Sequence, residues 1–161
     1  MKLKDNKNVQ IIALTALRIL IGWHLLYEGL IKVIDPTWSA ASYLNAAKGP
    51  FAAFFKSMAS NSGILEIINL LNQWGLVIIG LSLMIGLLSR WACIGGILLL
   101  FLYYISNPPF IGLVNEMYEG DYIIVSKNLI EMSALLVLYF SQTERIYGIE
   151  RLFIKYKQET V

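Results

Sequence analysis

The sequence has few of the residues on which metal and thiol sites depend. Its 161 residues include one cysteine and one histidine. A disulfide framework, Cys-x-x-Cys chemistry and the usual zinc or iron–sulfur ligand sets are therefore excluded within the chain, and we expect no metal. Charged residues make up only 15% of the chain and the net charge is +2. No basic surface for a nucleic-acid partner is expected from so little charge.

Apolar residues, by contrast, are abundant. They make up 57% of the chain, and the mean hydropathy is +0.62. An average soluble domain has about 25% charged residues, and one of this size could not bury so much apolar surface. The composition excludes a disordered chain and indicates a protein whose main partner is the lipid bilayer.

Four apolar runs predict four membrane-spanning helices. They cover residues 9–34, 64–88, 91–106 and 122–140. The first run is long enough to cross a hydrocarbon layer of about 30 Å, and it is too long and too polar for a cleaved signal peptide. The third is short and stops at Asn107-Pro108-Pro109, because proline ends a helix. We therefore predict an all-α fold: a single domain, residues 1–161, built as an integral membrane four-helix bundle.

The loops predict an orientation and a lid. Lysine and arginine gather in the two terminal segments and in the loop at residues 89–90, which places both termini in the cytoplasm. The opposite side carries a long first loop, residues 35–63, with a helix-compatible amphipathic stretch. Its apolar face is Phe51, Phe54, Phe55 and Met58. This segment is expected either to pack on the helices as a lid or to lie in the membrane interface.

The first helix carries a polar stripe. At about 100° per residue, its four polar side chains fall within a stripe of about 120°. These side chains are Arg18, His24, Glu28 and Lys32. Gly22 and Gly29 lie beside the stripe, where they would let another helix approach closely.

Polar residues on the other helices predict partners for this stripe. They are Asn72 on the second helix, Asn107 at the end of the third, and Lys127, Asn128 and Glu131 on the fourth. From the rise per residue, Glu28 should pair with Lys127, our preferred ion pair, or with Lys32. His24 should lie level with Glu131. Arg18 lies deeper, where no acidic residue of another span matches it.

Together these residues predict a small-molecule pocket, because an apolar aromatic pocket with a few convergent polar groups is the usual form of such a site. The candidates for proton transfer or catalysis are His24, Glu28, Lys127 and Glu131. The candidates for ligand binding are Arg18, Trp23, Tyr27, Lys32, Asn72, Tyr103, Asn107 and Asn128. The structural alternative is that the charges only fix helix register and the aromatics form an interfacial belt.

Three segments resemble the DoxX family of membrane proteins. They are residues 18–32, residues 103–112 and residues 125–131. The family includes DoxD, the small membrane subunit of thiosulfate:quinone oxidoreductase. The resemblance implies a four-helix protein of the bacterial cytoplasmic (inner) membrane and a quinone-linked reaction.

Three functions follow as hypotheses. The chain is a quinone-linked respiratory or sulfur-redox subunit, which would take electrons from a partner subunit. Alternatively it is a non-catalytic anchor or scaffold of an envelope complex. As a third alternative it is a small-anion or lipid transporter, which would need a homo-oligomer because the four predicted helices contain no repeat.

Overall fold

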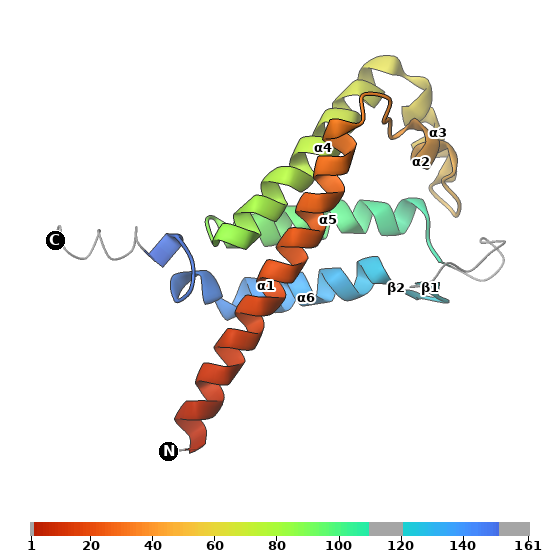
Figure 1. The fold of residues 1–161 in the computed structure, drawn as a ribbon. Helices are drawn as coiled ribbons and strands as arrows, with labels where there is room; N and C mark the ends of the chain where they lie inside the picture. The colour runs from red at the N-terminus through yellow and green to blue at the C-terminus, as the bar shows by residue number, and fades with distance from the viewer. Residues whose placement is uncertain (1, 110–120, 152–161) are drawn as a thin grey trace.

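A computed structural model of the chain describes residues 2–109 and 121–151, which are mostly helical (Figure 1). The helices are α1 (Lys2–Ile34), α2 (Ala41–Asn45), α3 (Ala52–Ser60), α4 (Ser62–Ile85), α5 (Ser89–Ser106), α6 (Lys127–Ser141) and the 3-10 helix η1 (Thr143–Arg145). The strands are β1 (Asp121–Tyr122) and β2 (Val125–Ser126). The predicted helical fold class is confirmed at this level.

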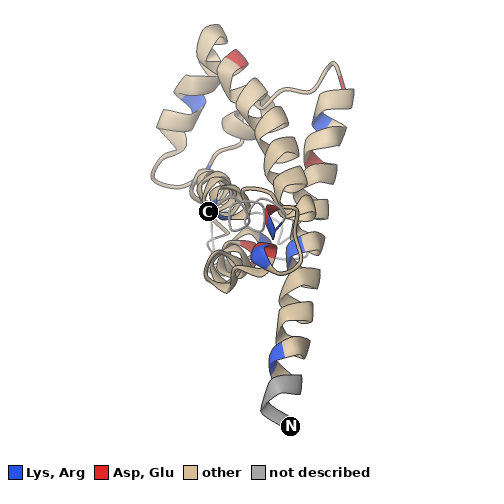
Figure 2. Cartoon of the chain, turned by 90° about the vertical axis from the view of Figure 1, so that its left-hand side faces the viewer, with Lys and Arg blue, Asp and Glu red and all other residues tan. Residues whose placement is uncertain are grey.

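The four long helices form two pairs that cross. Helix α1 packs along α4, and α5 packs along α6. In Figure 1 the α5–α6 pair runs across α1, and after the 90° turn of Figure 2 that pair is seen nearly end-on beside the upright α1 and α4. Charged residues gather where the pairs cross (Figure 2). The predicted four-helix bundle is not confirmed by this arrangement.

Three of the described helices are long and apolar enough to cross a membrane. They are Asn6–Ile34, Ser62–Ile85 and Ser89–Ser106. The fourth predicted span, residues 122–140, was wrong at its start, because β1 and β2 pair as an antiparallel hairpin and α6 begins only at Lys127. Its 15 residues reach about 22 Å, less than the hydrocarbon thickness. Hydropathy alone does not distinguish the β-branched run before Lys127 from a helix.

Ser126 fixes the start of α6. Its backbone is extended, and its side-chain oxygen accepts a hydrogen bond from the Leu129 amide at 3.4 Å. We expect Ser126→Ala to lower the free energy of unfolding by about 1 kcal/mol, because an amide of the first turn loses its acceptor. Ser133→Ala is the control, because this exposed serine donates one hydrogen bond, to the Leu129 carbonyl one turn earlier in the helix. It should change the free energy of unfolding by less than about 0.5 kcal/mol. Denaturant unfolding in detergent measures both, and equal stability of the two variants would contradict the cap.

Glycines bring α1 and α4 into backbone contact. A Cβ built on Gly29 would lie 2.7 Å from the Val77 nitrogen, and one on Gly22 would lie 2.9 Å from the Gly80 carbonyl oxygen. A Cβ on Gly80 would overlap the backbone of Leu26. The close approach predicted at Gly22 and Gly29 is confirmed, and it holds the polar stripe of α1 in a fixed direction.

Helices α2 and α3 form the lid over the α4–α5 end of the molecule. Their core contains Leu44 and Phe55. The Ala40 amide donates to Asn69 Oδ1 on α4 at 2.8 Å, and the Lys48 amide donates to the Ser106 carbonyl at 3.0 Å. The prediction that this segment packs on the helices is confirmed, with Phe55 buried and the neighbouring Phe54 exposed, while contact with the membrane interface stays a prediction.

Candidate functional site

A cavity of about 680 Å³ lies between α1, α4, the lid and the ends of α5 and α6. This volume is within the range of small-molecule sites. The predicted site residues on its wall are His24, Glu28, Lys32, Asn72, Tyr103, Lys127, Asn128 and Glu131. The residues that the sequence reasoning did not include are Leu25, Thr37, Trp38, Ser39, Ala40, Ser42, Tyr43, Leu76 and Leu100.

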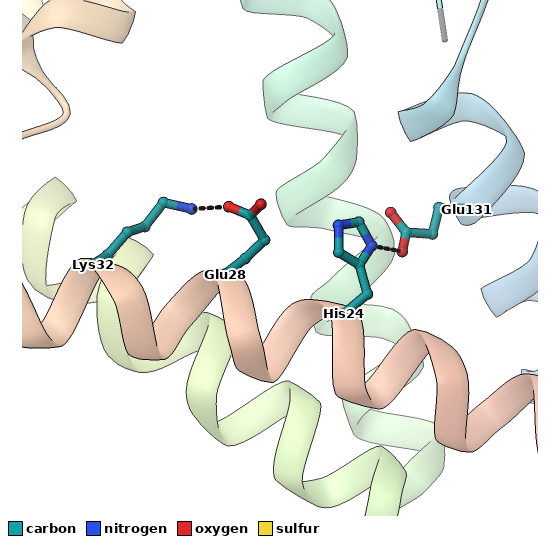
Figure 3. A network of polar contacts seen from close by, with 4 residues as sticks. All are labelled: His24, Glu28, Lys32 and Glu131. Carbon is teal, nitrogen blue, oxygen red and sulfur yellow. Dashed lines mark hydrogen bonds and ion pairs between the residues drawn. The ribbon is translucent and has the colours of Figure 1, made fainter. Parts of the chain in front are cut away.

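The shortest contact on the wall joins His24 to Glu131. The imidazole Nδ1 lies 2.5 Å from the carboxyl Oε1 (Figure 3). A proton must lie between two such acceptor-capable atoms, so the pair holds one exchangeable proton at the cavity wall. The two side chains come from helices of different pairs, and the meeting of His24 with Glu131 agrees with the sequence prediction.

Glu28 follows one turn after His24 on the same stripe. Its Oε2 lies 3.2 Å from Lys32 Nζ (Figure 3). The preferred prediction, a Glu28–Lys127 pair, was wrong, and the second candidate, Lys32, is the partner. The i,i+4 spacing brings these two side chains together on one helix. Lys127 lies in the first turn of α6, on the cavity wall, with no ion pair among the described residues.

Lid residues close the outer side of the cavity. The Lys32 ammonium lies 5.7 Å from the centre of the Trp38 ring. Trp38 is positioned by a turn in which the Thr37 hydroxyl and amide both donate to Asp35 Oδ1. These two hydrogen bonds lower the pKa of the Asp35 carboxyl. The signal for these lid residues in the sequence is the polar and aromatic run after Asp35, which the sequence reasoning places in the lid and not in the site.

Two buried polar groups lie next to each other on the wall, and neither makes a hydrogen bond of normal length and angle within residues 2–109 and 121–151. They are Asn72 Oδ1 and the Tyr103 hydroxyl. Buried polar groups whose hydrogen bonding is incomplete cost free energy, so this pair of side chains favours a polar group bound beside it. The Tyr103 ring is held in place because it packs edge-on against Tyr43 at 5.6 Å, and the Tyr43 hydroxyl donates to the Tyr103 carbonyl.

Four predicted site residues do not line this cavity. Trp23 and Tyr27 stack on each other and are 54% and 53% exposed on the outer face of α1. Asn107 caps the end of α5 and donates to Ser106 Oγ at 3.4 Å. Trp23 and Tyr27 both lie within the apolar span Asn6–Ile34, on a face of α1 that does not line the cavity.

Arg18 is the fourth, and it belongs to a different part of the molecule. Its side chain is 2% exposed, and Nη2 donates to the Tyr147 carbonyl at 2.5 Å. The acidic residues near it are Glu144, which also lies 3.8 Å from Arg90, and Glu150. The sequence showed no acidic match for Arg18 because only the spans were considered, whereas the partner follows the last long helix.

No protein-family model, curated protein or solved structure matches this chain. The family resemblance of the three segments therefore remains an expectation.

The cavity wall presents both hydrogen-bond donors and an exchangeable proton. Lys127 and Asn128 present N–H donors to the cavity, and the His24–Glu131 pair presents an exchangeable proton. Such a wall can bind a molecule with carbonyl acceptors and pass a proton to it. Among the described residues, no group of three His, Cys, Asp or Glu side chains could hold a metal ion.

Proposed function

We propose that the protein binds a quinone in the polar cavity and supplies a proton to it, as the membrane subunit of a quinone-linked oxidoreductase. The observation that carries this proposal is the His24–Glu131 pair facing a cavity of about 680 Å³. A quinone headgroup needs an apolar slot, donors aimed at its carbonyl oxygens and a proton source. Leu76 and Leu100 supply apolar walls and Lys127 supplies a donor.

The chemistry of the ligand sets what the protein must provide. A quinone takes up two electrons and two protons to become a quinol. The chain has one cysteine and one histidine, so we assign the electrons to a partner subunit with its own redox centre. This chain's residues orient the carbonyl groups and hold one proton at a time at His24 Nδ1 and Glu131 Oε1. The pair takes up a second proton from water after the first transfer, because the His24 side chain is 42% exposed.

The membrane arrangement is part of the same proposal. The three apolar helices and α6 would form a DoxX-like four-helix unit in a bacterial cytoplasmic membrane, with both termini in the cytoplasm. The position of Arg18 weakens the anion-transport alternative, because that alternative used Arg18 as the anion ligand of the cavity. The scaffold alternative remains an outcome of the tests below.

Lys127→Met tests the binding site. A donor bond from a charged group is worth about 1.5–3 kcal/mol, so this variant should bind a short-chain benzoquinone about 10-fold or more weakly than the native protein. The measurement is quenching of tryptophan fluorescence, since Trp38 lines the cavity, with native mass spectrometry to count bound quinone.

The control is Lys56→Met, which removes an exposed lysine of α3 from outside the cavity. It should bind as tightly as the native protein. Absence of quinone binding by the native protein, or equal binding by Lys127→Met, would overturn the proposed function. A variant that loses stability but not quinone affinity would favour the scaffold.

A further inference from the structure

A second cavity adjoins the polar one. It has a volume of about 200 Å³ and lies between the lid and helices α4 and α5. Its lining is mostly apolar: Leu44, Phe54, Phe55, Met58, Ile68, Leu71, Leu99 and Leu102, together with Ser106. We call it the apolar chamber. Ala40, Tyr43, Asn72 and Tyr103 line both cavities, so the two share one wall.

The chamber also reaches the outer surface of the protein. Three of its lining residues are largely exposed: Phe54 at 56%, Leu71 at 61% and Leu102 at 53%. Leu71 and Leu102 lie on α4 and α5, two of the helices apolar enough to cross a membrane. The chamber therefore lies between the polar cavity and an apolar outer face of the helices, where lipid chains would lie.

The shared wall carries the two neighbouring polar groups whose hydrogen bonding is incomplete within the described part of the chain. Asn72 Oδ1 and the Tyr103 hydroxyl lie where the polar lining changes to the apolar one. A ligand with its polar group at this boundary would satisfy these atoms and direct an attached chain toward the chamber. A headgroup without a chain would leave the chamber empty.

We infer that the ligand is a chain-bearing lipid, whose headgroup occupies the polar cavity and whose prenyl chain leaves through the apolar chamber into the bilayer. The inference rests on the proposed function, because the headgroup is the quinone proposed there. A group the size of a water molecule takes up about 30 Å³, so the chamber of about 200 Å³ has room for on the order of seven groups of that size. That is room for the first five-carbon unit, and the rest of the chain lies beyond Leu71 and Leu102.

Leu102→Trp tests this path. The residue is exposed at the outer side of the chamber, so a larger side chain there obstructs the chamber without filling the protein core. The matched control is Leu98→Trp, one turn earlier on α5, 59% exposed and outside both linings. Dissociation constants are measured for benzoquinones with the same headgroup and no chain, one prenyl unit or two prenyl units. The same detergent is used throughout, so partition into micelles cancels between variants.

Leu102→Trp should bind the two chain-bearing quinones at least about 10-fold more weakly than the native protein and the chainless one with less than about a twofold change. Leu98→Trp should resemble the native protein in all three cases. If the chainless quinone binds but Leu102→Trp does not discriminate by chain, the chamber is not the path and the proposed function still stands. If no quinone binds the native protein, both proposals are overturned.

Discussion

Gly80→Ala is expected to lower the free energy of unfolding by about 3 kcal/mol. The new methyl group would overlap the backbone of Leu26 and lie 2.7 Å from the Gly22 carbonyl oxygen. These are main-chain atoms, which cannot rotate away, so α1 and α4 must separate and lose packing along their contact. The loss exceeds the roughly 1 kcal/mol that alanine gains over glycine inside a helix. Equilibrium unfolding of the purified protein in mixed detergent micelles measures it.

Gly75→Ala is the matched control on the same helix. A Cβ there would meet only Leu99 Cδ1, at 3.8 Å, which is an ordinary contact. This variant gains helix propensity without overlap and should raise stability by about 0.5–1 kcal/mol. The two identical substitutions should therefore act in opposite directions. Equal effects would mean that α1 and α4 do not approach at Gly80.

The polar stripe of α1 could be predicted from the sequence because helical spacing alone decides which residues share a face. His24, Glu28 and Lys32 do line one cavity. The meeting of His24 with Glu131 was predicted from equal depth in a four-helix bundle, yet in the structure it arises where the two helix pairs cross. The prediction was right about the contact and incomplete about its cause.

Other features depend on which element lies against a given residue, and periodicity within one helix does not contain this information. The partner of Arg18 lies after the last long helix, in the segment with Glu144 and Tyr147. The lid residues Trp38 and Tyr43 line the cavity because of a turn at Asp35 and a bond from the lid to Asn69. The start of α6 depends on the hairpin at residues 121–126. The β-branched residues of this hairpin are as apolar as those of a membrane-spanning helix, so hydropathy does not reveal where the helix begins.

The largest functional effect is expected from Glu131→Gln. Under the proposed function, glutamine keeps the size and much of the hydrogen bonding of the side chain at His24 but cannot take up or release the shared proton. Proton transfer by a positioned side chain contributes about 10²–10⁴-fold to rate. We expect reduction of the bound quinone to slow by about 100-fold or more, while its dissociation constant changes by less than about threefold.

An electrode can supply the two electrons, so this rate is measurable by quinol absorbance without the partner subunit. Glu66→Gln is the control, because Glu66 is exposed on α4 and outside the cavity, and it should reduce quinone at the native rate. A carboxylate that only fixes helix register would give another result: Glu131→Gln would reduce quinone at the native rate and lose stability instead. That result would assign the His24–Glu131 contact to the packing of α1 against α6. A slow rate at native stability would assign it to proton supply, because the two roles differ only in whether the proton must leave the pair.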